Sequence, residues 1–293
     1  MMSKVLKFPT LFYQADNLSN SSQKNYLLNI KLTFILSLVS AVLGFFGLTS
    51  SNFAFVSAAL IFFSILATIY LVLSKKDQTW YRSRALAESV KSISFKYATG
   101  AEPFSLQLEA KVVDDNIIDK LNALLKEHQQ LSEDFCHIGS DINYITSEMK
   151  TIRNQNFEER KDFYLKNRIQ DQLDFYNINA EKNRKKSKFW FSIMILFQIL
   201  AMLFAILRAK YPEINIWPAD VFLLASSFVF TWLVTKKHRE LSASYRLTAF
   251  EISKIKEKFL NILDDKEFEI FVADSENAFS REHTQWLARQ DSL

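Results

Sequence analysis

The sequence predicts an all-α membrane protein with four transmembrane helices in two hairpins, extended by long helices outside the membrane. Three observations predict this fold. Glycine and proline are scarce, with four of each in 293 residues, and folds rich in β-turns or phosphate-binding loops need more of them. Four long apolar runs interrupt an otherwise charged chain. Lysine and arginine are concentrated at one end of those runs.

The four apolar runs each approach the ~20 residues that a helix needs to cross a ~30 Å hydrocarbon core. They span residues 32–49, 53–73, 189–207 and 217–235, and only the fourth contains a charged residue, Asp220. A soluble domain with four buried helices is the alternative, but the first two runs are three residues apart and have no polar face to present to water. A second span follows the first run at once, which argues against a cleaved signal peptide.

The distribution of cations predicts the orientation of the spans. The two loops within the hairpins carry only Arg208 and Lys210. The other ends of the spans are strongly basic, so the positive-inside rule places both termini and the long central segment in the cytoplasm. The flanking cations are Lys24, Lys31, Lys75, Lys76, Arg82, Arg84, Lys182, Arg184, Lys185, Lys186, Lys188, Lys236, Lys237 and Arg239.

Similar features flank the two hairpins in the same order. A Phe-Tyr pair precedes each hairpin, at residues 12–13 and 175–176, and a Lys pair follows each, at residues 75–76 and 236–237. This order predicts a duplicated unit, with residues 1–104 and 157–293 as the two copies and residues 105–156 as a helical linker. Chance resemblance between two membrane hairpins with basic flanks is the alternative.

The segments outside the spans read as helices. After the first hairpin we expect a helix that ends at Gly100 and Pro103 and in which Arg84 and Glu88 pair at i, i+4. A second helix is expected over residues 114–130. A third begins near Phe157 and has no breaker before residue 189, so it should continue into the third span and could act as a lever.

Polar residues within the first span share one helical face. They are Thr33, Ser37 and Ser40, and the same face includes two glycines. Small residues of this kind allow helices to pack closely. The alternative is that they line a pore, because polar groups that face lipid are costly.

The third and fourth spans contain further polar candidates. Asp220, Ser227 and Thr231 share a face of the fourth span, and a ring of such carboxylates in an oligomer would attract cations. Alternatively, Asp220 caps the first turn of its helix. Gln198 lies at the centre of the third span, where an amide needs a hydrogen-bond partner on another helix or subunit.

Six basic residues are candidates for holding the phosphates of a ligand. The alternative is that the run before the third span serves as the positive-inside anchor and contacts anionic lipid. The candidates are Arg160, Arg168, Lys182, Arg184, Lys185 and Lys186.

No motif in the sequence indicates an enzyme. The Walker-type phosphate loop, the dinucleotide-binding glycine motif and the HExxH zinc motif are all missing. The single Cys136 excludes an internal disulfide and a multi-cysteine zinc site. The four histidines have no metal-ligand spacing, and we interpret Cys136 and His137 as linker residues. We therefore expect no catalysis, no cofactor and no metal.

Small, polar, aromatic and charged residues recur at helical spacing around both hairpins. In the first half they are Ala15, Asp16, Ser19, Gln23, Lys24, Trp80, Tyr81, Arg84, Ala85, Glu88, Lys91, Ala101, Pro103 and Phe104. In the second half they are Tyr164, Arg168, Gln172, Phe175, Tyr176, Ala180 and Asn183. This pattern resembles the SLATT family, two-span bacterial membrane domains found beside nucleotide-signalling genes, here in tandem. Trp80, Arg84 and Glu88, with Gln198, are expected to have structural roles.

The resemblance implies an effector of bacterial anti-phage defence. Such a protein is expected to oligomerise into an ion-conducting pore that depolarises or permeabilises the inner membrane and so causes abortive infection. The implied partners are a nucleotide or oligonucleotide messenger and its cognate nucleotidyltransferase or sensor protein. The alternative is a non-conducting membrane scaffold that anchors a cytosolic partner enzyme.

Overall fold

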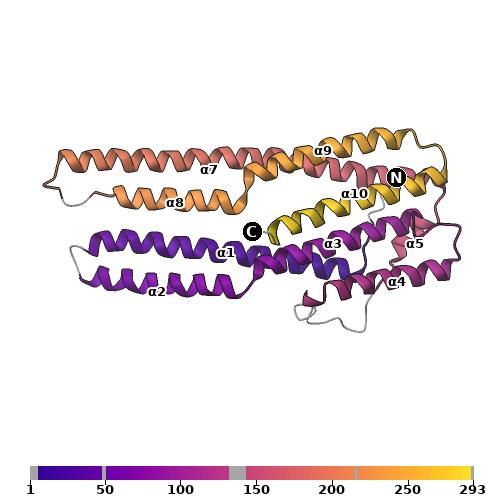
Figure 1. Cartoon of the computed structure of the whole chain (residues 1–293), viewed down its shortest axis with the longest axis horizontal. Coiled ribbons are helices and arrows are strands. Elements are labelled where there is room, and N and C mark those ends of the chain that lie inside the picture. The colour runs from indigo at the N-terminus through magenta and orange to yellow at the C-terminus, as the bar shows by residue number, and fades with distance from the viewer. Residues whose placement is uncertain (1–5, 48–50, 132–142, 215–216, 292–293) are drawn as a thin grey trace. The chain divides into compact units, whose positions relative to one another are not determined.

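The computed structural model describes residues 6–47, 51–131, 143–214 and 217–291. These residues form helices and connecting turns without any strand, which confirms the predicted all-α class (Figure 1). The chain divides into two compact units. The membrane unit comprises Asn25–Lys75 and Phe175–Ala249, and the extramembrane unit comprises Met1–Lys24, Lys76–Asp174 and Phe250–Leu293.

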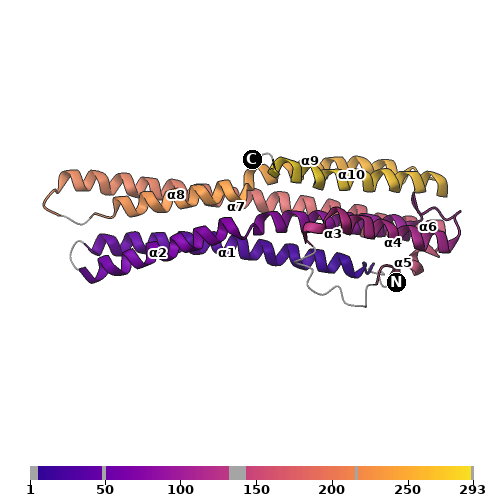
Figure 2. The same cartoon turned by 60° about the horizontal axis from the view of Figure 1, so that its bottom comes forward.

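The membrane unit contains two antiparallel hairpins. In both views α1 lies beside α2 and α7 lies beside α8 (Figures 1 and 2). Among the described residues, four helices are long and apolar enough to cross a membrane, as the four apolar runs predict, so the chain is a multi-pass membrane protein. The spans lie in α1 (Thr10–Gly47), α2 (Ser51–Leu73), α7 (Asp171–Lys210) and α8 (Ala219–Lys236), and the unit also includes the first half of α9 (His238–Leu260).

The outer surface of the membrane unit is strongly apolar. Large side chains such as Phe55, Phe62 and Met202 are more than half exposed, and a soluble monomer rarely exposes apolar patches of this extent. The backbone of each span makes its hydrogen bonds within its own helix, which is the condition for crossing hydrocarbon. These side chains are therefore positioned to face lipid.

The extramembrane unit is organised around α3 (Lys76–Thr99), half of whose residues are buried. The helix ends where the sequence predicts: Gly100 has a φ of +77° and the backbone N–H of Ala101 donates to the carbonyl of Lys96 at 2.9 Å, a Schellman cap. The other elements are the start of α1, α4 (Ala110–Glu127), η1 (Gln129–Leu131), α5 (Ser147–Arg153), α6 (Phe157–Tyr164), η2 (Leu165–Gln170), the end of α9 and α10 (Asp265–Asp291).

Two of the predicted helices differ from their expected form. The helix expected over residues 114–130 begins four residues earlier, at Ala110, because Val113 is buried and extends the apolar face. The third begins at Phe157 as predicted, with a capping box between Asn156 and Glu159. It continues to Lys210, but residues 165–170 form a π-helical turn. Cys136 and His137 lie outside the described residues.

Both hairpins end in the same backbone conformation. Lys75 after α2 and Lys237 after α8 each have a φ of +45°, in the left-handed region. A non-glycine residue adopts this conformation at some cost in energy, and here it redirects the chain from a span into the next helix. The shared joint agrees with the order of features that the two halves of the sequence have in common.

Candidate functional site

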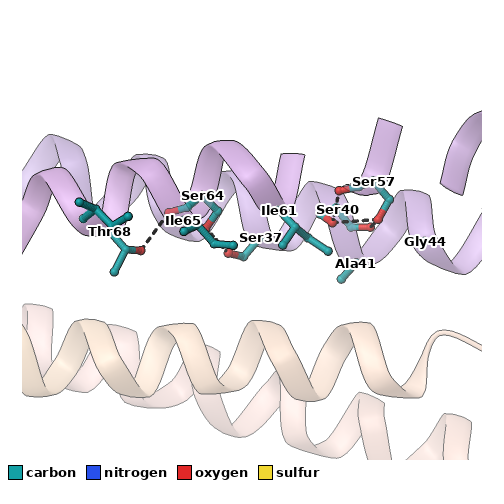
Figure 3. Close-up of a pocket in the computed structure, with 10 residues that line it drawn as sticks. Ser37, Ser40, Ala41, Gly44, Ser57, Ile61, Ser64, Ile65 and Thr68 are labelled. Atoms are coloured by element: carbon teal, nitrogen blue, oxygen red, sulfur yellow. Dashed lines mark hydrogen bonds between the residues drawn. The ribbon is translucent and has the colours of Figure 1, made fainter. Parts of the chain in front are cut away.

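A seam of serine hydroxyls joins α1 to α2 in the first hairpin (Figure 3). The Ser37 and Ser64 hydroxyls are 2.9 Å apart, and those of Ser40 and Ser57 are also 2.9 Å apart. The Ser40 hydroxyl also lies 3.0 Å from the Ser57 carbonyl, and the Ser57 hydroxyl 2.9 Å from the Ser40 carbonyl. We call these four residues the serine seam. Its hydroxyls are paired with one another, so they need no water.

A groove of about 420 Å³ runs along the serine seam. Beyond the four serines it is lined mainly by Ala41, Gly44, Ile61 and Ile65 (Figure 3). A Cβ at Gly44 would lie 3.2 Å from the Ser57 Oγ, so glycine allows the close approach of the two helices. The hydroxyl contacts of Ser37 with Ser64 and of Ser40 with Ser57 give Ser37 and Ser40 a role in packing α1 against α2. Their predicted place in a pore wall stays a prediction, as does that of Thr33, whose hydroxyl donates to the carbonyl of Asn29.

Aromatic rings join α7 to α8 in the second hairpin. Phe204 stacks on Phe222 with ring centroids 5.4 Å apart and an interplanar angle of 5°. Phe222 also contacts Phe197, and Trp190 contacts Trp232, at centroid distances of 6.2 and 6.3 Å. We call these residues the aromatic seam. It contains a serine too, Ser226, whose hydroxyl lies 3.5 Å from the Met194 carbonyl.

The polar face of α8 consists of Asp220, Ser227 and Thr231, all exposed. The Ser227 and Thr231 hydroxyls donate to the carbonyls four residues earlier on the same helix, at 3.0 Å each. The Asp220 side chain is 88% exposed and lies 3.8 Å from Arg208. The N-cap of α8 is Pro218 and Asp220 stands in the first turn, where the helix dipole favours a carboxylate. The three candidates therefore share one uncovered face.

Gln198 is exposed in the middle of the apolar part of α7. Within the described residues, no hydrogen bond joins its amide to another side chain or to the backbone of a second helix. The expected partner on another helix of the same chain is therefore not found there. A partner on a second subunit stays a prediction.

A buried arginine network occupies the core of the extramembrane unit. Arg168, in the π-helical turn, donates from Nε and Nη2 to the two carboxylate oxygens of Glu276 at 2.8 and 2.7 Å. Tyr164 and Ser92 donate to the same carboxylate at 2.9 and 2.7 Å. The Arg168 and Glu276 side chains are 2% and 0% exposed. This network joins α3, α6, η2 and α10 around one ion pair.

Glu276 favours the charged form of Arg168 and the neutral form of Tyr164. Burial alone would lower the pKa of the Arg168 guanidinium, but the charge and hydrogen bonds of Glu276 outweigh it and raise the pKa well above its usual range. Burial and the nearby Glu276 carboxylate raise the pKa of the Tyr164 hydroxyl, which therefore remains a donor. Burial, followed by the charge of Arg168, lowers the pKa of Lys91 beside the network.

Arg168 and Arg160, two of the six phosphate candidates, are already paired in this conformation. Arg160 donates to both carboxylate oxygens of Asp265, at 2.8 and 2.7 Å, and to the carbonyl of Thr99 at 2.6 Å. A phosphate would have to displace these carboxylates. Arg184 is paired with Glu181, and Lys185 is 4.0 Å from it. Lys182 and Lys186 are exposed on α7.

The residues that carry the sequence resemblance around the first hairpin lie together. The predicted pair is confirmed, with Arg84 2.7 Å from Glu88, and Arg84 also bonds Asp16 of α1 at 3.0 Å. The Ser19 hydroxyl donates to the carbonyl of Trp80 at 3.2 Å. The motif therefore docks the first part of α1 on α3.

Sequence reasoning missed several residues of these sites, among them Ser57, Ser64 and Glu276. Ser57 and Ser64 stand seven residues apart on α2, which places them on one face, and this spacing could have matched them to Ser37 and Ser40. Glu276 stands between Val272 and Phe279, on the apolar face of α10. A carboxylate at such a position signals a buried partner. No cluster of three or more potential metal ligands occurs in the described part of the chain.

Both halves of the chain match families of the same group. Residues 9–161, more than half of the chain, match the SMODS and SLOG-associating 2TM effector domain 3. Residues 164–286 match the SMODS and SLOG-associating 2TM effector domain 1. The chain belongs to the SLATT family. It is a tandem of two SLATT domains, each with one two-span hairpin, as predicted. No curated protein and no solved structure matches the chain.

SLATT domains are two-span effector domains linked to defence signalling systems. The descriptions of both families name an effector domain with two transmembrane segments and no enzymatic activity. The predicted boundaries after residues 104 and 156 stay predictions.

Proposed function

We propose that this tandem SLATT protein oligomerises in the bacterial inner membrane and conducts ions as a defence effector. Its two termini face the cytoplasm, and a nucleotide or oligonucleotide messenger, or the enzyme or sensor that handles it, controls conduction. Depolarisation of the membrane then limits phage spread through abortive infection.

One observation carries the proposal: polar side chains remain uncovered on the outer faces of α7 and α8. Gln198 lies in the middle of a span without a partner in the described part of the chain, and an unpaired amide in hydrocarbon is costly. Asp220, Ser227 and Thr231 form an exposed stripe along α8. Contact between subunits would pair the amide, and a shared axis would hydrate the stripe.

The buried arginine network supplies a route for control. It clamps the π-helical turn that precedes α7, and breaking a buried ion pair by removing one partner costs about 3–5 kcal/mol. A signal that shifts α10 would therefore alter the start of the helix that continues into the third span. The family's association with signalling systems, contained in its description, supports this form of control.

The first experiment is ionic current through the purified full chain in planar lipid bilayers. Asp220→Lys should lower the permeability ratio of K⁺ to Cl⁻ if the polar face of α8 lines the pathway. Glu213→Lys is the matched control, because it makes the same charge change in the loop between α7 and α8. Current that is unaffected by Asp220→Lys would remove α8 from the pathway, and no current from folded, inserted protein would favour the scaffold.

The oligomer is tested separately by mass measurement of the protein in nanodiscs. Gln198→Leu should reduce the subunit number, while Gln198→Asn, which keeps an amide, should retain most of it. An unchanged subunit number in Gln198→Leu contradicts the proposed role of the amide.

A further inference from the structure

Two lysines from two helices lie over Trp232 in the membrane unit, and the charge of a third lysine acts on one of them. The Lys31 Nζ of α1 lies 5.4 Å from the centroid of the Trp232 ring, and the Lys236 Nζ of α8 lies 5.7 Å from it. The positive charges of Lys186, on α7, and of Lys31 both act on Lys236. Three ammonium groups therefore share one small region. We call Lys31, Lys186, Lys236 and Trp232 the lysine–tryptophan cluster.

No carboxylate balances the cluster within the described residues. None of Lys31, Lys186 and Lys236 forms an ion pair there. A second group of cations in the same unit is different, because Arg184, Lys185 and Arg246 all lie within 4.0 Å of Glu181. Like charges held close together repel. The cluster thus carries an excess of positive charge that an anion would stabilise.

The cluster also contains a hydrogen-bond donor without an acceptor. The Nε1 of Trp232 is buried and has no hydrogen-bond partner in the described part of the chain. A buried indole N–H usually finds a partner, and an unmade hydrogen bond of this kind is costly. An anion with oxygen acceptors would satisfy the donor and neutralise the lysines together.

The position of the cluster along the spans restricts the kind of anion. Lys31 directly precedes the first apolar run, Lys236 directly follows the fourth, and Lys186 stands three residues before the third. All three are therefore at the polar edge of a span. Phosphate groups of lipids lie at this depth, and lysine and tryptophan are enriched there.

We propose that the lysine–tryptophan cluster is a binding site for a phosphate group at the membrane interface. The lysines neutralise the charge of the phosphate, and the indole N–H donates to one of its oxygens. The phosphate of an anionic phospholipid and that of a soluble nucleotide share this chemistry. Occupancy links α1, α7 and α8, and therefore both hairpins, through one ligand. The site does not depend on ion conduction.

The test is the thermal unfolding temperature of the full chain in nanodiscs of phosphatidylcholine with increasing phosphatidylglycerol. A ligand that binds only the folded protein stabilises it by RT ln(1 + L/Kd), where L is the ligand concentration, so the unfolding temperature should rise with the phosphatidylglycerol content, and the onset of the rise gives the apparent affinity. Each single Lys→Gln change in the cluster should weaken the apparent affinity about fivefold, since a lysine near an anionic surface contributes about 1 kcal/mol.

The matched control is a triple variant that loses the same charge at the same end of the spans. K24Q/K188Q/R239Q should keep the rise in unfolding temperature, and K31Q/K186Q/K236Q should lose it. Trp232→Phe keeps an aromatic face but has no N–H, so it should bind several-fold more weakly. If both triple variants lose the rise in unfolding temperature equally, the response is due to the general positive charge of the surface, and the proposal is wrong.

Soluble phosphates distinguish the source of the ligand. Inorganic phosphate and ATP are added to nanodiscs of pure phosphatidylcholine. Stabilisation by ATP that is lost only in K31Q/K186Q/K236Q supports the site and assigns it to a soluble phosphate. Stabilisation by phosphatidylglycerol alone supports it as a lipid site. No rise in the unfolding temperature with phosphatidylglycerol or with a soluble phosphate contradicts the proposal.

Discussion

Each of the two membrane hairpins has two spans and is followed by a lysine in the left-handed backbone conformation. The contacts that hold the two helices together nevertheless differ between the hairpins. The first uses the hydroxyls of the serine seam and the close approach that Gly44 permits. The second uses ring contacts of Phe204, Phe222 and their neighbours. Lipid chains are as apolar as these side chains, so burial alone does not drive association in a bilayer. Hydrogen bonding and shape complementarity are thus two separate solutions to one problem.

The difference has a consequence for how each hairpin tolerates change. Interhelical hydrogen bonds in membranes contribute about 0.6 kcal/mol each on average, so the serine seam depends on the fit of the backbones more than on any one hydroxyl. The aromatic seam depends on the volume of a few rings. Substitutions can separate these two dependences.

The largest expected effect is in the aromatic seam. Phe222→Ala removes contacts with both Phe197 and Phe204, and should destabilise the protein by about 3 kcal/mol, the low end of the range for Phe→Ala changes. Denaturant unfolding in mixed micelles measures the effect. Phe230→Ala, at an exposed ring of the same helix, is the control and should change stability much less. Equal effects would show that ring packing does not hold α7 to α8.

A smaller effect is expected where the helices of the first hairpin approach closely. Gly44→Leu adds a side chain whose Cβ lies 3.2 Å from the Ser57 Oγ, so α1 and α2 must separate, at a cost of about 2 kcal/mol typical of overpacking. Ala58→Leu, on the exposed side of α2, adds volume without a neighbour. The measurement is the rate of disulfide formation between two cysteines introduced on facing positions of α1 and α2. This rate should fall in Gly44→Leu and stay unchanged in Ala58→Leu. An unchanged rate would contradict the close-packing role of Gly44.

The second hairpin should also be the more sensitive to acid. His238 follows it, is buried, and its Nδ1 lies 2.7 Å from the Asn183 Oδ1. Burial, and then the charges of Lys236 and Lys186, lower the pKa of His238 to about 4. The unfolded state, with a His pKa of about 6.5, binds the proton first. Stability is therefore full above pH ~6.5 and falls as the pH drops toward 4.

The expected loss between pH 7 and pH 5 is on the order of 1 kcal/mol, after allowance for screening by water. Unfolding at several pH values measures it, and His238→Gln should flatten the dependence over this window. The first hairpin has no histidine at the corresponding place, where Lys76 stands. A pH profile identical in His238→Gln and the natural chain would exclude this histidine as its source.

The smallest effect is the coupling between two hydroxyls of the serine seam. A double-mutant cycle on Ser40→Ala and Ser57→Ala should give a coupling of about 0.6 kcal/mol. The control is the same cycle on Ser227→Ala and Thr231→Ala in α8, where both hydroxyls donate to carbonyls of their own helix. The coupling between these two side chains should be close to zero. Zero coupling in the seam would mean that the close approach alone stabilises the first hairpin.

The parts of this architecture that depend on local composition could be predicted from the sequence. Charge-free runs of span length predict the four membrane helices, and Gly100 predicts the end of α3, because each signal acts within a few residues. The i, i+4 pair of Arg84 and Glu88 is local in the same sense. The chemistry of the candidate sites is not. Arg168 meets Glu276 across 108 residues of sequence, and no spacing rule connects them.

The serines and the lysines show the same limit. Thr33, Ser37 and Ser40 share a face by helical periodicity, but the partners Ser57 and Ser64 emerge only when α2 is placed against α1. In the sequence, nothing distinguishes Lys182, Arg184, Lys185 and Lys186 from one another, because all four belong to the same basic run before the third span. Tertiary structure separates them, since Glu181 pairs with Arg184 and Lys185, whereas the charge of Lys186 acts on Lys236 of another helix.

The π-helical turn at Leu165–Gln170 sets the rotational phase of everything that follows it in the same continuous helix. An α-helix advances about 100° per residue, so loss of the extra residue that a π turn accommodates would rotate α7 by about that angle. The ring of Phe204 and the amide of Gln198 would then turn to different sides of the span. The choice of which side chains face the neighbouring helix in the membrane is therefore made some twenty residues before the membrane begins.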